Sequence, residues 1–234
     1  MSEGPKLSIL SAGAPKTGVR LCAEAYFAAT GRPFEIEFAT APTIGERAAA
    51  GDFDVDVVVA PHSTIEKFEI EGVVVAGSVV SLGSVATGVA VRGNKYEPDL
   101  STAEGVRQAL LAAEVIIYNR ASSGQHIEEM IERLGIAQAV KEKTVRTDTG
   151  GEAMERLAGD RSGFPIGFGQ ITEIKLKENL GIHLAGPLPS ELAKSTSYNA
   201  GLSSTAANIE DANVLLSIFA SREGQRLLFE TGVA

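Results

Sequence analysis

Short apolar runs and longer helical stretches alternate along most of the chain. The run at residues 55–60 is rich in β-branched and small residues, as in a central parallel strand. Ser101 and Glu104 form a capping-box pattern that opens a helix. Strands are predicted at residues 7–10, 34–38, 55–60, 73–80, 85–91, 115–118, 144–146, 166–168, 183–185 and 198–202. Helices are predicted near residues 17–30, 41–50, 64–71, 101–113, 124–134, 151–157, 171–178, 209–220 and 221–230. This alternation is typical of parallel sheets with right-handed crossovers, so we predict an α/β fold.

The alternation is interrupted twice. Residues 73–92 hold two predicted strands with no helix between them, and residues 186–196 form a connection that contains Pro187 and Pro189. One interruption precedes the middle segment and the other follows it, which indicates that the chain leaves one lobe and returns. We therefore predict lobe one at residues 1–83 plus 194–234 and lobe two at residues 84–193.

The composition is that of a globular protein and excludes some partners. Of the 234 residues, 44% are hydrophobic and 22% are charged. The net charge of −9 argues against binding to nucleic acid or an anionic membrane, since both need a basic face. A small anion remains compatible, because backbone N–H groups at helix N-termini bind anions locally.

Signal peptides, membrane-spanning segments and cysteines indicate the cellular compartment of a protein. We see no signal peptide, and no run approaches the ~18 apolar residues of a membrane span. We expect a monomeric cytoplasmic protein without membrane insertion, or a periplasmic one if a leader has been removed. Cys22 is the only cysteine and lies in an apolar stretch, so we expect a small buried hydrophobe.

Neither a metal site nor a catalytic motif is apparent. His62, His126 and His183 have no partner at a metal-ligand spacing. The sequence contains no nucleophile elbow and no phosphate-binding loop. We therefore expect no metal and no cofactor.

Three stretches carry a family resemblance. They are LSILSAGAPKTG with the helix and strands that follow it, GEAMERLAGDRSGFPIGFGQITE, and DANVLLSIFASREGQRLLFETGVA. Together they cover most of the chain and resemble the molybdate-binding proteins of ABC transporters. The resemblance implies a two-lobed type II periplasmic-binding-protein fold, with the ligand in an interlobe cleft and a permease as possible partner.

The positions that contact molybdate in that family differ here. The resemblance puts the family's first serine on Ala14, its second at or near Ala41 and Pro42, and its tyrosine on Phe168. Each lost donor to a desolvated oxyanion costs about 1.5–3 kcal/mol. We therefore expect a small organic carboxylate rather than molybdate.

The candidate ligand-binding residues follow predicted strands, because ligands in open α/β sheets bind outside the carboxyl ends of strands. They are Ser11, Ala12, Gly13, Ala14, Thr40, Ala41, Thr43, His62, Arg120, Ser122, Ser123, Gly124, Phe168 and Gln170. The strongest local signal is residues 119–124, where a strand ends and a helix opens with two serines and a glycine. Arg120 could add a bidentate contact to a carboxylate. The alternative is that Ser122, Ser123, Thr40 or Thr43 only cap helices.

Two functions stay open at this stage. The first is a binding protein that traps a small oxyanion by closure of two lobes. The second is an enzyme on the same fold, because the resemblance extends to isomerases of unsaturated carboxylates such as aconitate. His62 would then act as acid or base and Arg120 would hold a carboxylate. A cytoplasmic ligand sensor would need a partner domain that this sequence does not encode.

Overall fold

The chain folds into two compact units. A computed structural model describes residues 6–93, 97–120 and 122–234, and of Ser122 only the backbone. Unit 1 comprises Met1–Val85 and Thr196–Ala234, and unit 2 comprises Ala86–Ser195. The chain passes from one unit to the other along β4 (Val80–Arg92) and returns at the start of β9 (Ser195–Leu202).

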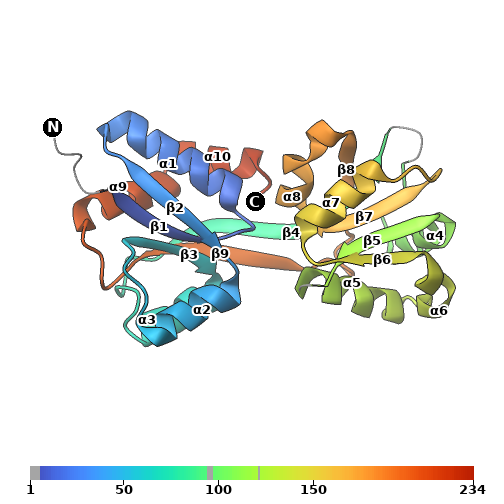
Figure 1. Ribbon diagram of the computed structural model, residues 1–234, viewed down its shortest axis with the longest axis horizontal. Coiled ribbons are helices and arrows are strands. Elements are labelled where there is room, and N and C mark those ends of the chain that lie inside the picture. The colour runs from blue at the N-terminus through green and yellow to red at the C-terminus, as the bar shows by residue number, and fades with distance from the viewer. Residues whose placement is uncertain (1–5, 94–96, 121) are drawn as a thin grey trace. The chain divides into compact units, whose positions relative to one another are not determined.

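Unit 1 is built on a mixed sheet with the order β2-β1-β3-β9 (Figure 1). Its first three strands are β1 (Leu7–Ala12), β2 (Phe34–Ala39) and β3 (Val57–Pro61). β1 is parallel to both β2 and β3, whereas β9 is antiparallel to β3. Strands β1 and β3 are almost wholly buried, which explains why apolar residues predominate in both.

Helices cover both faces of the unit 1 sheet. They are α1 (Lys16–Thr30), α2 (Ala41–Ala50), α3 (His62–Ile70), α9 (Ile209–Ala220) and α10 (Arg222–Glu230). In Figure 1, α1, α9 and α10 lie on one face and α2 and α3 on the other. Burial of Tyr26 and Phe219 on one face and of Ile44 and Phe68 on the other joins the layers into one hydrophobic core.

Unit 2 is built on a second sheet, with the order β4-β7-β5-β6 and with β8 paired to β4. Its strands besides β4 are β5 (Val115–Asn119), β6 (Thr144–Thr147), β7 (Pro165–Gln170) and β8 (Ile182–Pro187). β5 is parallel to β6 and β7, and β4 is antiparallel to β7 and β8.

Two separate cores hold the helices of unit 2. The helices are α4 (Ala103–Ala112), α5 (Ser122–Arg133), α6 (Ala137–Val140), α7 (Gly150–Gly159) and α8 (Ile171–Leu176). Side chains of α4, α5 and α6 form one core, which includes Leu110, Met130 and Val140. Side chains of α7 and α8 form the other core, as with Met154 and Ile174. The two groups lie on opposite faces of the sheet (Figure 1).

Both units follow the same chain path. In unit 1 the first strand, β1, lies between β2 and β3; in unit 2, β5 lies between β6 and β7. The chain leaves β1 into a helix on one face and leaves β3 into a helix on the other face (Figure 1). The same holds for β5 and β7. Adjacent parallel strands whose helices leave on opposite faces open a crevice at their carboxyl ends, where ligands bind in α/β proteins.

Three local predictions are corrected by the structure. Residues 73–79 do not form a strand, because Gly77 has a φ of 78° and turns the chain within the apolar run; the next strand, β4, begins at Val80. The N-cap of α4 is Thr102, whose hydroxyl accepts the Gly105 N–H; Ser101 instead donates to Asp99. The short helix α6 was not predicted. Most other predicted elements are present with boundaries shifted by a few residues.

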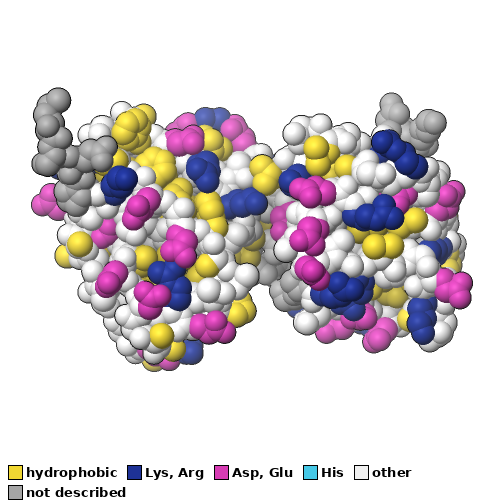
Figure 2. Space-filling view, viewed as in Figure 1, with side chains coloured by type: hydrophobic (Ala, Val, Ile, Leu, Met, Phe, Trp, Pro, Cys, Tyr) yellow, Lys and Arg dark blue, Asp and Glu magenta, His cyan; other side chains and the backbone are white. Residues whose placement is uncertain are grey.

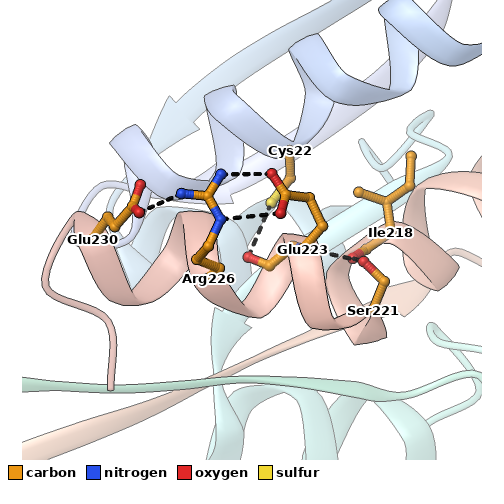
Figure 3. A network of polar contacts seen from close by, with 7 residues as sticks. Cys22, Ile218, Ser221, Glu223, Arg226 and Glu230 are labelled. Atoms are coloured by element: carbon orange, nitrogen blue, oxygen red, sulfur yellow. Dashed lines mark hydrogen bonds and ion pairs between the residues drawn. The ribbon is translucent and has the colours of Figure 1, made fainter.

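Cys22 is a buried hydrophobe, as predicted. Its side chain is fully buried, and its Sγ lies 3.7 Å from the Gly224 carbonyl oxygen. Figure 3 shows Cys22 on α1 facing α10, where Arg226 bridges Glu223 and Glu230. Burial, with a smaller contribution from Glu223, raises the pKa of the Cys22 thiol to about 12.

Candidate functional site

The first element of the candidate site is the turn between β1 and α1. Ser11 is fully buried, and its hydroxyl donates to the Ala12 carbonyl oxygen at 3.0 Å. Gly13 is exposed, with open space where a side chain would lie. Among the residues that the structure describes, neither the Gly13 nor the Ala14 N–H has a hydrogen-bond acceptor. This turn therefore offers two backbone donors to a ligand.

The second element is the turn between β2 and α2. Thr40 is the N-cap of α2, and its Oγ1 accepts the Thr43 N–H at 3.3 Å. The Thr40 and Thr43 hydroxyls also lie 2.8 Å apart. Ala41, the first residue of α2, is partly buried. The capping interpretation thus explains Thr40 and Thr43 without a ligand, although both side chains are exposed.

The third element is the turn between β3 and α3. His62 is the first residue of α3 and follows Pro61, the last residue of β3. Its ring is exposed, and its Nδ1 lies 3.1 Å from the side-chain nitrogen of Asn199. Asn199 is buried on β9, where it pairs with Ala60.

The strand register brings these three turns to one edge of the unit 1 sheet. Ala12 lies beside Ala39, and Ser11 lies beside Val59. The β1–α1 turn is therefore flanked by the β2–α2 turn and the β3–α3 turn. We call Gly13, Ala14, Thr40 and His62 the unit 1 edge.

The corresponding edge of unit 2 is built around Asn119, which lies in the predicted 119–124 segment but is not one of the candidate ligand-binding residues. Asn119 is buried at the end of β5, and its Oδ1 accepts the Gly124 N–H at 3.1 Å. The Ser123 hydroxyl lies 2.9 Å from the Asn119 side-chain nitrogen and 3.3 Å from Oδ1. The predicted donors of Ser123 and Gly124 therefore already have an internal partner. The Ser122 side chain lies outside the described residues.

Arg120 extends from the same turn. Its guanidinium pairs with Asp148 at 3.0 Å, and both side chains are exposed, at 61% and 80%. Its N–H donates to the Thr147 carbonyl oxygen, which ties the turn to β6. An exposed pair of this kind contributes little to stability, so the guanidinium can exchange Asp148 for another carboxylate at small cost.

Protein carboxylates occupy the starts of α7 and α8 in unit 2. Glu152 accepts the Asp148 and Thr149 N–H groups at the start of α7. Glu173 accepts the Gln170 N–H at 3.3 Å at the start of α8. The Glu173 carboxylate lies so close to Gly150 that a Cβ there would be 2.1 Å from Oε2. These carboxylates make the α7 and α8 ends unfavourable for an anion.

Phe168 and Gln170 both lie on β7, two positions apart, but differ in environment. Phe168 is 2% exposed and packs in the core formed with α4, α5 and α6. Gln170 is partly buried and precedes α8. Phe168 therefore brings neither a hydroxyl nor an accessible ring to the edge.

A cavity of about 330 Å³ lies elsewhere in unit 2, between α5, α6 and β6. Its lining includes Tyr118, Glu128 and Arg146, with the guanidinium 5.3 Å from the Tyr118 ring centre and 3.0 Å from Glu128. None of the predicted site residues described by the structure lines it. These contacts are explained by packing.

The described residues contain no group of three or more His, Cys, Asp or Glu side chains that could hold a metal ion. No helix in the described part of the chain is long and apolar enough to span a bilayer. The face shown in Figure 2 carries acidic and basic side chains interspersed over each unit.

Comparison with known proteins decides the family. The family described as bacterial extracellular solute-binding protein matches residues 7–234. The chain belongs to this family. A curated relative, "Aconitate isomerase" from Pseudomonas sp, is 27% identical over 236 residues, which cover 97% of this chain and 87% of the relative.

Solved structures show that this solute-binding protein has the periplasmic-binding-protein fold of molybdate receptors. The substrate-binding domain of a putative molybdenum ABC transporter from Clostridium difficile superposes with a TM-score of 0.75 at 15% identity, covering 97% of both chains. The periplasmic molybdate-binding protein of Azotobacter vinelandii gives a TM-score of 0.69 at 16% identity, covering 98% of this chain and 99% of its own. At such identities the likeness concerns the fold and leaves the ligand open.

Proposed function

We propose that this solute-binding protein binds a small organic carboxylate at the unit 1 edge. The observation that carries the proposal is the pair of backbone N–H groups of Gly13 and Ala14, which have no acceptor among the described residues. They follow β1, which pairs with β3, and His62 begins the helix after β3; ligands of α/β proteins commonly bind at the carboxyl ends of such strands. Both residues precede Pro15, the N-cap of α1, and an anion is favoured near a helix N-terminus.

The hydroxyl positions argue for a carboxylate over molybdate. Ala14 and Phe168 have no hydroxyl, and the Ser11 hydroxyl donates to its own chain. Thr40 and Thr43 pair with each other. A tetrahedral oxyanion needs donors around four oxygens, and each missing one costs about 1.5–3 kcal/mol. A carboxylate needs donors around two oxygens only.

We further propose that units 1 and 2 are the predicted lobes, residues 1–83 plus 194–234 and 84–193. Within unit 2, the Arg120 guanidinium is the candidate carboxylate contact, because it can exchange Asp148 for a ligand. Delivery of the ligand to a transporter permease is the partner function that the family favours.

A thermal-shift panel of small carboxylates, molybdate, tungstate and sulfate tests the proposal. A ligand present at about 100 times its dissociation constant stabilises the folded state by about 2.7 kcal/mol. We expect a concentration-dependent rise in melting temperature with at least one di- or tricarboxylate. A rise with molybdate or tungstate alone would overturn the carboxylate assignment.

Isomerisation of an unsaturated carboxylate is the second candidate. The observation in its favour is the curated relative whose name is aconitate isomerase. Incubation with cis- or trans-aconitate in D₂O, followed by ¹H NMR, would detect interconversion or deuterium incorporation. Absence of both at full ligand occupancy would leave binding as the function.

A further inference from the structure

We propose that Asn199 is a positioning residue that makes His62 a hydrogen-bond donor rather than a base. The inference deepens the proposed function, because it assigns the chemical role of His62 at the unit 1 edge. It rests on the contact between the Asn199 side-chain nitrogen and His62 Nδ1, which are 3.1 Å apart.

Asn199 is held firmly in place. It lies in β9, whose residues pair antiparallel with β3 so that Asn199 is opposite Ala60. The residue is 9% exposed. Its amide therefore has a fixed position beside the turn in which His62 follows β3, and a buried amide hydrogen costs free energy unless it is donated to an acceptor.

The chemistry of the two nitrogens determines the tautomer of His62. An amide nitrogen donates hydrogen bonds and does not accept them. His62 Nδ1 can accept this bond only when it carries no proton, so the proton of the neutral ring is on Nε2. His62 then presents an Nε2–H donor, and its exposed ring leaves that atom free to meet a ligand.

This tautomer distinguishes the two candidate functions. An Nε2–H group suits a carboxylate oxygen and adds a third donor to the Gly13 and Ala14 N–H groups. The same group has no lone pair with which to take a proton from carbon at Nε2. In an isomerase, His62 in this state would act first as the acid, and a different group would have to remove the proton.

The direct test is the tautomer of His62 in the ligand-free protein. Long-range ¹H–¹⁵N spectra of ¹⁵N-histidine-labelled protein at about pH 8, above the ordinary pKa of imidazole, separate the two neutral tautomers. His126 is an internal reference, because its Nε2 lies 2.8 Å from the Leu192 carbonyl oxygen and must carry a proton to donate there.

Substitutions at Asn199 separate positioning from the intrinsic preference of the ring. We expect a single Nε2–H tautomer in the wild type, a mixture in Asn199→Ala and the Nδ1–H form in Asn199→Asp, whose carboxylate accepts. Asn213→Ala, an exposed change on α9, is the matched control and should leave the wild-type pattern unchanged. An Nδ1–H tautomer in the wild type, or the same mixture in the wild type and Asn199→Ala, would overturn the inference.

A double-mutant cycle with cis-aconitate as the probe links the tautomer to binding. Asn199→Ala should weaken binding about 2- to 10-fold, in line with one hydrogen bond, and should have no effect in a His62→Gln background. An undiminished effect in that background would mean that Asn199 does not act through His62. Failure of cis-aconitate and the other carboxylates to bind would count against the proposed function alone, because the tautomer is measured without ligand.

Discussion

Gly124 lies so close to Asn119 that a Cβ on Gly124 would be 1.7 Å from the Asn119 carbonyl oxygen. The Gly124 N–H donates to the Asn119 side chain at 3.1 Å, so the end of β5 and the start of α5 are joined through both groups. This contact sets the shape of the turn that carries Arg120 and Ser123.

Gly124→Ala should therefore destabilise the protein by about 3 kcal/mol or more, because the obstacle is backbone that cannot rotate away. Urea denaturation followed by circular dichroism measures the change. Gly45→Ala is the matched control: Gly45 lies inside α2 with open space around it, so alanine should be neutral or stabilising. Equal stability of the two variants would show that the turn can relax.

Substitution of Asp56 should also lower the stability of the folded protein strongly. It is 2% exposed, and its carboxylate accepts N–H groups from Ser8 at 2.9 Å and from the Asn208 backbone and side chain at 2.8 and 3.0 Å. Asp56→Ala leaves these donors without their acceptor and should cost about 3 kcal/mol. Urea denaturation of Asp56→Ala checks this, with Asp54→Ala at an exposed neighbouring position as the control. A loss in the free energy of unfolding below about 1 kcal/mol would contradict the role given to the Asp56 carboxylate.

Cys22 should be unreactive in the folded protein. Its pKa of about 12 leaves almost no thiolate at about pH 8, and its side chain is fully buried. Titration with a disulfide reagent should show a slow reaction in buffer and a fast one in denaturant. Fast reaction under native conditions would mean that α1 separates readily from α10.

Arg120 should matter more for binding than for stability. Removal of its exposed pair with Asp148 should change the free energy of unfolding by about 0.5 kcal/mol or less. If the guanidinium contacts the ligand, Arg120→Ala should weaken carboxylate binding about tenfold or more, and Arg120→Lys should restore only part of it. Calorimetric titration of both variants measures this, and unchanged affinity in Arg120→Ala would remove Arg120 as a candidate ligand contact.

Patterns that act along a short stretch of sequence were predictable. The run at residues 55–60 predicted a buried parallel strand because all of its residues except Asp56 are apolar, and most of β3 lies in it. The similar run at residues 73–80 led to a wrong strand prediction, because Gly77 supports a turn that a hydrophobic pattern does not reveal. Val74 is buried there by packing against Gly201, without belonging to a strand.

The arrangement of the turns that hold the candidate residues was predictable, but their internal contacts were not. The turns after β1, β2 and β3 lie at one edge of the unit 1 sheet, since parallel strands end together. The partner of His62 could not be found, because Asn199 is 137 positions away in sequence. The carboxylate of Glu173 against Gly150 is likewise a consequence of folding, with no signal in either local sequence.

Residue-resolved titration tests the central claim most directly. Amide ¹H–¹⁵N spectra should be recorded while the carboxylate that stabilises most in the thermal panel, and separately molybdate, is added. The account predicts that the Gly13, Ala14 and His62 resonances shift together and saturate with one dissociation constant for the carboxylate, and stay in place with molybdate. Shifts at these residues with molybdate alone, or carboxylate shifts confined to the cavity beside Tyr118 and Arg146, would contradict it.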